Sequence, residues 1–541
     1  MIGDLMDYDE LVKQHIKELR KTPLKWFRDT LDLRHEGDIE EKVLCCLLMI
    51  ATYFGTISHV LLTGESSSGK TSLLDACRGL IPEEDYLYLL GATESSVKNA
   101  EELLSTINFL IFTEFDAVKS GQDESLEFLM RMLSSEDSGG DFLKCEQYGN
   151  DWKPVRKKLV PKSLFTTYAK GTHNIGNENL NRLWIIEPEQ SETKTRDVIG
   201  RRILQDEFEG IKQKKQYGFR AEVFIWNYIN GKAHLSKDPF KKREVYEEVE
   251  VTKKNVMGNE VTEKVRQLKE TIEYKIKIPY RSTLLYMFRD ASETRATRDI
   301  KRFVSLIEII TKLHIAMDSD CRAILQTDNY DPVNQGSIIW YLAEPQDFIL
   351  ACELSWLTIQ QNMRNLTDAD IKLYQTLIEM EIKAEEDSTI LYDEKEWGFT
   401  PKEICDEAEV SYEYGRKRIW NLAKYGLVIR SSHPKNSGKR TYYWSSQASS
   451  DSIADWWIYQ DLVERDCKDF MKRHEIEKNF EKYYSIYNNP DEMPVNRLSN
   501  EHERVEKLAT LRAERVKSIE SQESIEHRRQ QEFLFGYKRN A

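Results

Sequence analysis

The chain has 541 residues, of which 40% are hydrophobic and 31% are charged, which is enough apolar material for about two to four globular domains. It has no apolar run of about 18 residues and begins with an acidic stretch, which excludes a transmembrane helix and a secretion or transit signal and favours a cytoplasmic protein. The net charge of −14 excludes a wholly basic surface but leaves room for local basic patches, and the eight cysteines without a C-x2-C pair predict neither zinc nor disulfides.

Residues 1–38 predict short amphipathic helices, and residues 39–54 predict an apolar core helix. An apolar strand at 60–62 then runs into GESSSGKT (64–71) and a further helix. This is the Walker A pattern G-x4-G-K-[ST], whose backbone N–H groups surround nucleotide phosphates at a helix N-terminus. Lys70 would neutralise the β and γ oxygens and the Thr71 hydroxyl would bind Mg²⁺; the alternative is a Gly/Ser turn without a ligand. The predicted nucleotide-binding residues are Gly64, Ser67, Ser68, Gly69, Lys70, Thr71 and Ser72.

A second strand is predicted from residue 86, and residues 107–112 (INFLIF) predict a third that ends directly before Thr113 and Glu114. An acidic residue at the end of a buried strand is what a Walker B element requires, because it carries a carboxylate to the magnesium-bound water. We therefore expect Glu114 to be the catalytic base and part of the magnesium site. Asp116 is the competitor, and an ordinary strand-end glutamate is the alternative. Thr113 stands where an aspartate is usual, so magnesium would depend more on Thr71, the phosphates and water.

Residues 142–160 have two extended flanks around a Gly-Asn-Asp turn and predict a β-hairpin. Its second flank carries four basic residues that suit DNA phosphates: Lys153, Arg156, Lys157 and Lys158. The alternative is a solvated hairpin that protects the edge of a sheet.

Residues 163–168 (SLFTTY) predict a fourth strand that ends in two threonine hydroxyls. Thr166 and Thr167 fill the position of a sensor of the γ-phosphate, and we assign that role to Thr167. A fifth apolar strand, 183–186, follows Arg182 directly. In a ring ATPase an arginine here would reach the γ-phosphate of the neighbouring subunit and stabilise transition-state charge; the alternative is a structural ion pair.

These motifs, in this order, resemble the AAA+ ATPase core of replicative helicases from phages, plasmids and other mobile elements, which are relatives of the minichromosome maintenance helicases. The resemblance covers about residues 39–330 and is carried by GESSSGKT, LLGATESSV, the strand before Thr113-Glu114, LMRMLSSE, the hairpin, SLFTTYA and NLNRLWIIEPEQSETKT. It implies an α/β P-loop core at 39–204 and a helical lid at 276–365. ATP and Mg²⁺ would be the cofactors and a hexameric ring the assembly. Arg298 would be a lid arginine that contacts nucleotide, with Arg295 and Arg302 as competitors.

Between the core and the lid, residues 205–275 mix both charge signs around a Met-Gly-Asn turn. This pattern predicts a solvated hairpin and a helix rather than a binding site.

Residues 366–446 predict a separate unit with the element order of a winged helix. A helix at 368–380 is followed by the capping box of Thr400 and Glu403, a helix at 411–425, and a hairpin at 427–444. The unit also resembles the winged-helix domains that end many archaeal and mobile-element ATPases. Its basic residues predict DNA binding, although winged helices also contact proteins. They are Arg416, Lys417, Arg418, Lys439 and Arg440, joined by Arg430 and Lys435. Residues 447–541 predict a charged helical tail that would bind a replication partner.

The sequence thus favours a hexameric, ATP-driven DNA helicase of a mobile element, with no membrane partner. Two alternatives stay open. One is an AAA+ switch that binds DNA without unwinding it, such as a helicase loader, a transposition regulator or a defence ATPase. The other is a DNA-binding regulator in which nucleotide only sets assembly, and the Thr113 substitution keeps it open.

Overall fold

The computed structural model divides the chain into two compact units, which are described separately. Unit 1 comprises Met1–Thr358 and Tyr459–Ile486, and unit 2 comprises Ile359–Ile458 and Tyr487–Ala541. The structure describes residues 8–64, 68–89, 101–112, 140–148, 151–159, 162–169, 183–188, 192–203, 208–229, 240, 243–254, 260–288, 294–318, 321–327, 336–364, 368–386, 398–424, 428–432, 442–446, 459–477, 480 and 483–487. The chain therefore returns to unit 1 at Tyr459, within residues 447–541, which were expected to form a single tail.

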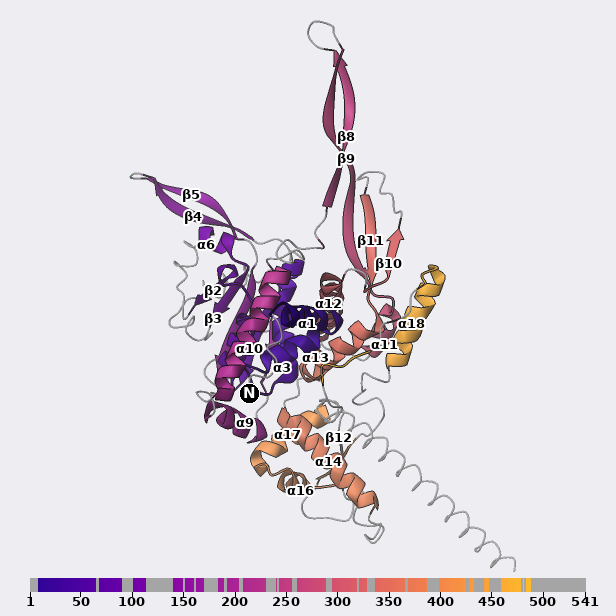
Figure 1. The fold of residues 1–541 in the computed structure, drawn as a ribbon. Coiled ribbons are helices and arrows are strands. Elements are labelled where there is room, and N and C mark those ends of the chain that lie inside the picture. Colours follow the sequence, from indigo (N-terminus) through magenta and orange to yellow (C-terminus); the bar gives the residue numbers. More distant parts are fainter. Residues whose placement is uncertain are drawn as a thin grey trace, which may run out of the picture. The chain divides into compact units, whose positions relative to one another are not determined.

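A five-stranded parallel sheet forms the centre of unit 1 (Figure 1). Its strands are β1 (His59–Gly64), β2 (Tyr86–Leu89), β3 (Phe109–Phe112), β6 (Ser163–Ala169) and β7 (Trp184–Ile186), in the order β2-β3-β6-β1-β7. β1 and β3 are buried along their whole length and read as apolar runs, which is the signal that made them predictable from the sequence. The expected α/β class of this part of the chain is confirmed.

Helices from the first 230 residues surround this sheet. They are α1 (Tyr8–Lys21), α2 (Pro23–Leu31), α3 (Ile39–Ile50), η1 (Ala51–Phe54), α4 (Lys70–Arg78), η2 (Glu83–Asp85), α6 (Glu101–Thr106), α9 (Glu192–Ile203), α10 (Phe208–Phe224) and η4 (Ile225–Ile229). The N-terminal helices are part of the core, because Trp26 and Phe27 of α2 are buried and their rings lie 6.1 and 5.2 Å from that of Phe224. This aromatic cluster joins α2 to α10.

Two hairpins extend from unit 1 (Figure 1). The first pairs β4 (Gly140–Tyr148) with β5 (Asp151–Leu159), as the sequence predicted. The second pairs β8 (Arg243–Lys254) with β9 (Glu260–Lys277) and confirms the hairpin expected in the charged insertion.

The end of β9 also belongs to a second sheet, ordered β10-β11-β9-β8. β10 (Ile324–Thr327) and β11 (Gly336–Leu342) lie inside the region expected to be a helical lid, and β11 pairs in parallel with residues 271–277 of β9. The helices of this region are α11 (Arg281–Met287), α12 (Thr294–Met317) and α13 (Pro345–Arg364), and α18 (Gln460–Arg473) contacts α11. Strands were not expected here, since the pairing of β11 with β9 joins segments about 65 residues apart and leaves no local signal.

A buried ion-pair cluster joins α12, α13 and the turn before β10. The Asp347 carboxylate accepts hydrogen bonds from Arg322 Nη2 at 2.6 Å and from Thr311 Oγ1 at 3.0 Å. His314 Nδ1 lies 3.3 Å from the same carboxylate, and Glu344 N donates to it at 2.9 Å. Burial alone would raise the pKa of Asp347, but the Arg322 charge and His314 hold it well below its ordinary value. Asp347 therefore remains ionised at neutral pH.

Residues 483–487 include a segment that is held to three helices of unit 1 by hydrogen bonds. Arg28 Nη1 donates to the Ile486 carbonyl at 2.6 Å, and His314 Nε2 lies 3.0 Å from the Tyr484 hydroxyl. The Ile486 N–H donates to Glu353 Oε2 at 3.1 Å. This segment thus closes part of the unit 1 core, a role that the sequence did not indicate.

Glu353 predicts a pH dependence of unit 1 stability. Burial raises its pKa from the ordinary 4.5 to about 7. Because the folded state holds this proton more tightly than the unfolded state, the unfolding free energy falls as pH rises through this window. We expect Glu353→Gln, which keeps an acceptor for Ile486, to stabilise the protein by about 2 kcal/mol at pH 8 and by much less at pH 5. Urea unfolding at both pH values measures this, with Asp469→Asn as the exposed control; an equal effect at both pH values contradicts it.

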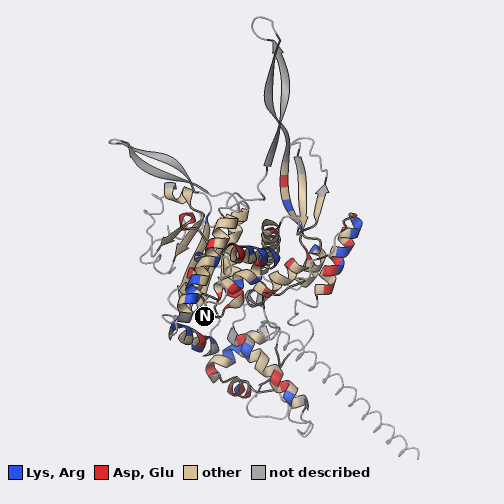
Figure 2. Ribbon diagram, in the orientation of Figure 1, with Lys and Arg blue, Asp and Glu red and all other residues tan. Residues whose placement is uncertain are grey.

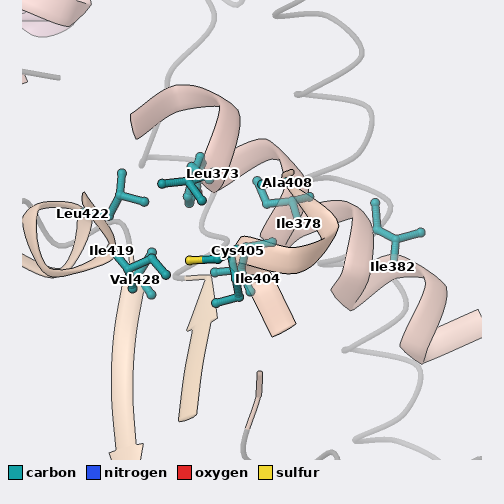
Figure 3. Packing of buried hydrophobic residues seen from close by; sticks show 11 residues of the cluster. Leu373, Ile378, Ile382, Ile404, Cys405, Ala408, Ile419, Leu422 and Val428 are labelled. Carbon is teal, nitrogen blue, oxygen red and sulfur yellow. The ribbon is translucent and has the colours of Figure 1, made fainter. Parts of the chain in front are cut away.

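The described residues of unit 2 between 368 and 446 form three helices followed by a two-stranded antiparallel hairpin. These elements are α14 (Asp368–Glu386), α16 (Pro401–Glu407), α17 (Tyr412–Lys424), β12 (Val428–Ser432) and β13 (Tyr442–Ser446). Figure 3 shows their buried side chains meeting in one cluster, with Leu373 and Ile378 from α14, Ile404 from α16 and Ile419 from α17. The capping box at Thr400 is confirmed. The Thr400 side chain accepts a hydrogen bond from Glu403 N, and the Glu403 carboxylate accepts one from Thr400 N.

Candidate nucleotide site

The phosphate loop lies at the carboxyl edge of the parallel sheet. β1 ends at Gly64 and α4 begins at Lys70. In register, Gly64 is beside Ala169 and Leu61 is beside Thr166, which is in turn beside Phe112 at the end of β3. The ends of β1, β3 and β6 therefore meet at one edge, where open parallel sheets bind ligands. The order with β6 between β1 and β3 puts the predicted sensor strand between the loop and the Walker B strand.

Lys70 reaches back across the loop from the first residue of α4. Its side chain is largely buried, and Nζ donates to the Gly64 carbonyl at 3.0 Å and to Ser68 Oγ at 3.3 Å. Gly69 has φ +91°, a conformation that favours glycine, and serves as the N-cap of α4. The loop thus places an ammonium group and a helix N-terminus together, which suits a polyphosphate.

The residues that follow Lys70 are open to solvent. Thr71 and Ser72 are exposed in the first turn of α4. A threonine hydroxyl next to the phosphate-binding lysine can bind Mg²⁺, with phosphate oxygens and water as the other ligands. Among the described residues there is no cluster of three or more His, Cys, Asp or Glu that could hold a metal ion.

Thr166 and Thr167 are both buried in β6. Neighbouring residues of a strand point to opposite faces, so their hydroxyls serve different sides of the sheet. Thr166 Oγ1 lies 3.5 Å from the Thr167 carbonyl, and Thr167 is beside Leu62 of β1, two residues before the loop begins.

Several predicted site residues lie outside the described residues. They are Ser67, Thr113, Glu114, Asp116, Arg182, Lys435, Lys439 and Arg440. Their described neighbours are Ser68, Phe112 at the end of β3, and Leu183 just before β7. The roles of these residues stay predictions.

The lid arginines differ in their surroundings. Arg298 is exposed on α12, whereas Arg302 donates to Asp299 at 3.0 Å and its guanidinium lies 5.8 Å from the Trp184 ring of β7. Arg302 is therefore engaged in packing α12 near the sheet. Arg298 remains the better placed of the two for a ligand, and the side chain of Arg295 lies outside the described residues.

Two residues that no motif indicated, Lys194 and His35, contact the phosphate loop and the first turn of α4, and a third, Asp38, joins them to each other. Asp38 Oδ2 accepts a hydrogen bond from Lys194 Nζ at 2.5 Å and lies 2.7 Å from His35 Nε2. His35 Nδ1 lies 3.2 Å from Ser72 Oγ, and Lys194 Nζ donates to the Ser68 carbonyl at 3.3 Å. Burial alone would raise the pKa of Asp38, but the His35 hydrogen bond and the Lys194 charge lower it. The HEGD stretch at 35–38, polar and directly before an apolar helix, was the one available sequence signal.

The predicted DNA-binding residues fall on two separate elements. On β5, Lys153 is opposite Glu146 and Lys158 is opposite Asp141, while Arg156 and Lys157 face Leu143 and Phe142 in the register of the hairpin. These are pairings of the backbone, and the side chains of this hairpin lie outside the part of the chain that the structure describes.

On α17 of unit 2, Arg416 and Lys417 are exposed. Figure 2 colours the Lys and Arg positions of the described elements blue. Arg418 instead donates to the buried Asp370 at 3.1 Å, and its guanidinium lies 5.1 Å from the Tyr414 ring. Arg430 lies 4.5 Å over the exposed ring of Trp420. Arg418 thus packs α17 against α14, and among the described side chains of α17 the exposed positive charges are those of Arg416 and Lys417.

No protein family model matches the chain, and no curated protein matches it. Among solved structures, the chain is similar to the Aeropyrum pernix ORC1 protein in complex with DNA, with 10% identity over 80% of this chain and 93% of that chain. The TM-score is 0.22, too low to carry an inference about function. Among the helices that the structure describes, none is long and apolar enough to cross a membrane. The nucleotide site is therefore defined by its own geometry.

Proposed function

We propose that the chain is an AAA+ ATPase that binds MgATP at the phosphate loop. The observation that carries this is the position of Lys70, whose ammonium spans the loop between Gly64 and Ser68 beside the left-handed Gly69. The parallel sheet with β6 between β1 and β3 supports it, because Thr167 then lies on the strand next to the loop.

In this proposal each residue has a separate task. Lys70 and Thr71 hold the phosphates and Mg²⁺, Glu114 takes the proton of the attacking water, and Thr167 contacts the γ-phosphate. β7 begins beside Val60, at the edge of the sheet opposite the phosphate loop. An arginine directly before β7 would accordingly serve a neighbouring subunit rather than its own, which favours Arg182 as a finger in a hexameric ring.

We further propose that this ATPase is a DNA helicase of a mobile element. The β4–β5 hairpin with its four basic residues and the exposed Arg416 and Lys417 of α17 support contact with DNA phosphates. Three helices followed by a hairpin support a winged helix in unit 2. Hydrolysis would move the β4–β5 hairpin along one strand, and residues beyond 486 would bind a replication partner.

Strand displacement tests the helicase. A labelled fork with 5′ or 3′ single-stranded arms is mixed with wild type or with Glu114→Gln, and native mass is measured with ATP and single-stranded DNA. The expected result is ATP-dependent unwinding of one fork polarity by a six-subunit wild type only. Robust DNA-stimulated hydrolysis without unwinding of either fork would overturn it.

Thr113, in place of the usual Walker B aspartate, favours the second candidate, a DNA-binding regulator that works as a nucleotide switch with negligible turnover. Weaker metal binding would slow turnover, so nucleotide would act mainly by setting assembly. The same assay separates the two candidates, because a switch assembles with ATP and binds DNA but displaces no strand.

Unit 2 gives a further prediction. Replacing both Arg416 and Lys417 by alanine is expected to weaken duplex binding about tenfold or more and to reduce the slope of log K against log salt by about 2, since two phosphate contacts are lost. Fluorescence anisotropy over a salt series measures both quantities. The matched control is Lys402→Ala together with Lys372→Ala, two exposed positions on other helices of unit 2. An unchanged salt slope would show that α17 does not face DNA.

A further inference from the structure

Lys194 and the His35–Asp38 turn form a contact with the phosphate loop that is separate from its motif. Lys194 lies in the first turns of α9, after β7, and its Nζ bridges the Asp38 carboxylate and the Ser68 carbonyl at 2.5 and 3.3 Å. His35, on the other side of Asp38, lies against Ser72 Oγ at 3.2 Å. The contacts therefore hold both the end of the loop and the first turn of α4.

The backbone around this contact is built for it. Asp38 adopts φ 51° and ψ 49°, a left-handed conformation that is uncommon for residues other than glycine, and Gly37 before it has φ +71°. A Cβ on Gly37 would lie 3.3 Å from the Lys194 side chain, and a Cβ on Gly69 would lie 3.2 Å from His35 Cε1. The Asp38 carboxylate is fully buried. Two glycines thus make room for the Lys194 and His35 side chains that meet this carboxylate and the loop.

We propose that Lys194 and His35, joined through Asp38, are positioning residues that hold the phosphate loop ready for nucleotide. This inference rests on the proposed nucleotide binding at that loop, and it extends the site to a helix and a turn outside the Walker motifs. The set of His35, Asp38 and Lys194 is called the loop clamp.

The loop clamp acts on affinity rather than on the chemical step. A loop whose N–H groups already face the phosphates loses less conformational freedom on binding, and this gain is the same for ATP and ADP. A uniform gain in binding lowers KM and leaves kcat unchanged. Residues that touch the reacting atoms, such as Glu114, would change kcat instead.

The first test compares two changes on α9, each of which replaces a cationic side chain by methionine. Lys194→Met removes the cation of the loop clamp. Arg201→Met removes a cation that also ties α9 to the N-terminal segment, through the Asp32 carbonyl at 2.6 Å and the Glu36 carboxylate. Binding of a fluorescent ADP analogue is measured without DNA, and KM and kcat for ATP are measured with it. Lys194→Met is expected to raise Kd for ADP and KM for ATP by about tenfold or more with kcat within about twofold, because a charge-assisted hydrogen bond is lost. Arg201→Met is expected to leave Kd within about twofold.

A second set of variants separates positioning from loss of folding. Lys194→Met leaves the Asp38 carboxylate buried with one partner fewer, so the double variant Asp38→Asn with Lys194→Met removes that charge as well. Lys194→Arg keeps a cation and is expected to recover most of the affinity. Thermal melting without nucleotide reports folding. The proposal is overturned if a folded double variant binds ADP like the wild type, or if Arg201→Met raises Kd as much as Lys194→Met.

The results that contradict the proposed function differ from those that contradict the loop clamp. Wild type that binds ADP but neither hydrolyses ATP nor unwinds DNA contradicts the helicase while the loop clamp is still judged by Kd alone. Wild type that binds no nucleotide contradicts both.

Discussion

Replacing Lys70 by alanine is expected to lower kcat for ATP hydrolysis by at least about 100-fold. The ammonium spans the loop from Gly64 to Ser68 and is the one described cation inside the turn, so its loss leaves the β and γ oxygens without their main counter-charge. Phosphate release under saturating ATP and single-stranded DNA measures the effect. The fold should persist, because β1 and α4 are held by buried apolar residues such as Leu62, Leu73 and Leu74.

The matched control is Lys214→Ala, which removes an exposed lysine of α10. It is expected to hydrolyse ATP at the wild-type rate. If Lys70→Ala and Lys214→Ala are equally active, the loop is a Gly/Ser turn and hydrolysis takes place elsewhere. Circular dichroism of both variants excludes unfolding as the cause of lost activity.

Replacing Asp347 by alanine is expected to destabilise unit 1 by about 3–5 kcal/mol, the largest stability effect among the described residues that we predict. Arg322 would keep its charge in the core with Glu344 at 3.6 Å as the remaining acidic partner, and Thr311 and His314 would each lose the carboxylate while keeping a backbone carbonyl partner. Because the pKa of Asp347 is held low in the folded state, its contribution is present at neutral pH and is lost as pH falls through that low value. Urea unfolding at pH 7 measures the loss.

Two further variants serve as the control and the test of this prediction. Asp469→Ala removes an exposed carboxylate of α18 and is expected to change stability by less than about 0.5 kcal/mol. The triple variant Arg322→Met, Glu344→Gln and Asp347→Leu removes the three charges of the cluster and is expected to be more stable than Asp347→Ala alone, because none of the three is left unpaired. A triple variant less stable than Asp347→Ala would show that pairing of these charges is not what stabilises the cluster.

The sequence by itself determined the features whose signals are local. The phosphate loop, the apolar strands around it and the capping box of Thr400 depend on residues within about ten positions of one another, so spacing and periodicity reveal them. The two hairpins were predictable for the same reason, since a turn and its flanks are contiguous. Local signals also placed Arg416 and Lys417 on an exposed helix, but they did not separate these two from Arg418, whose partner Asp370 is 48 residues away.

Only the tertiary structure decided which distant residues meet. Lys194 reaches Asp38 across 156 positions, Arg28 reaches Ile486 across 458, and β11 joins β9 within a region expected to be helical. Such contacts form only when the whole chain has folded, and the sequence around either residue does not indicate its partner. The phosphate loop is therefore legible as a motif in one stretch of sequence, while the side chains that hold it in place come from a turn before it and a helix more than 120 residues after it.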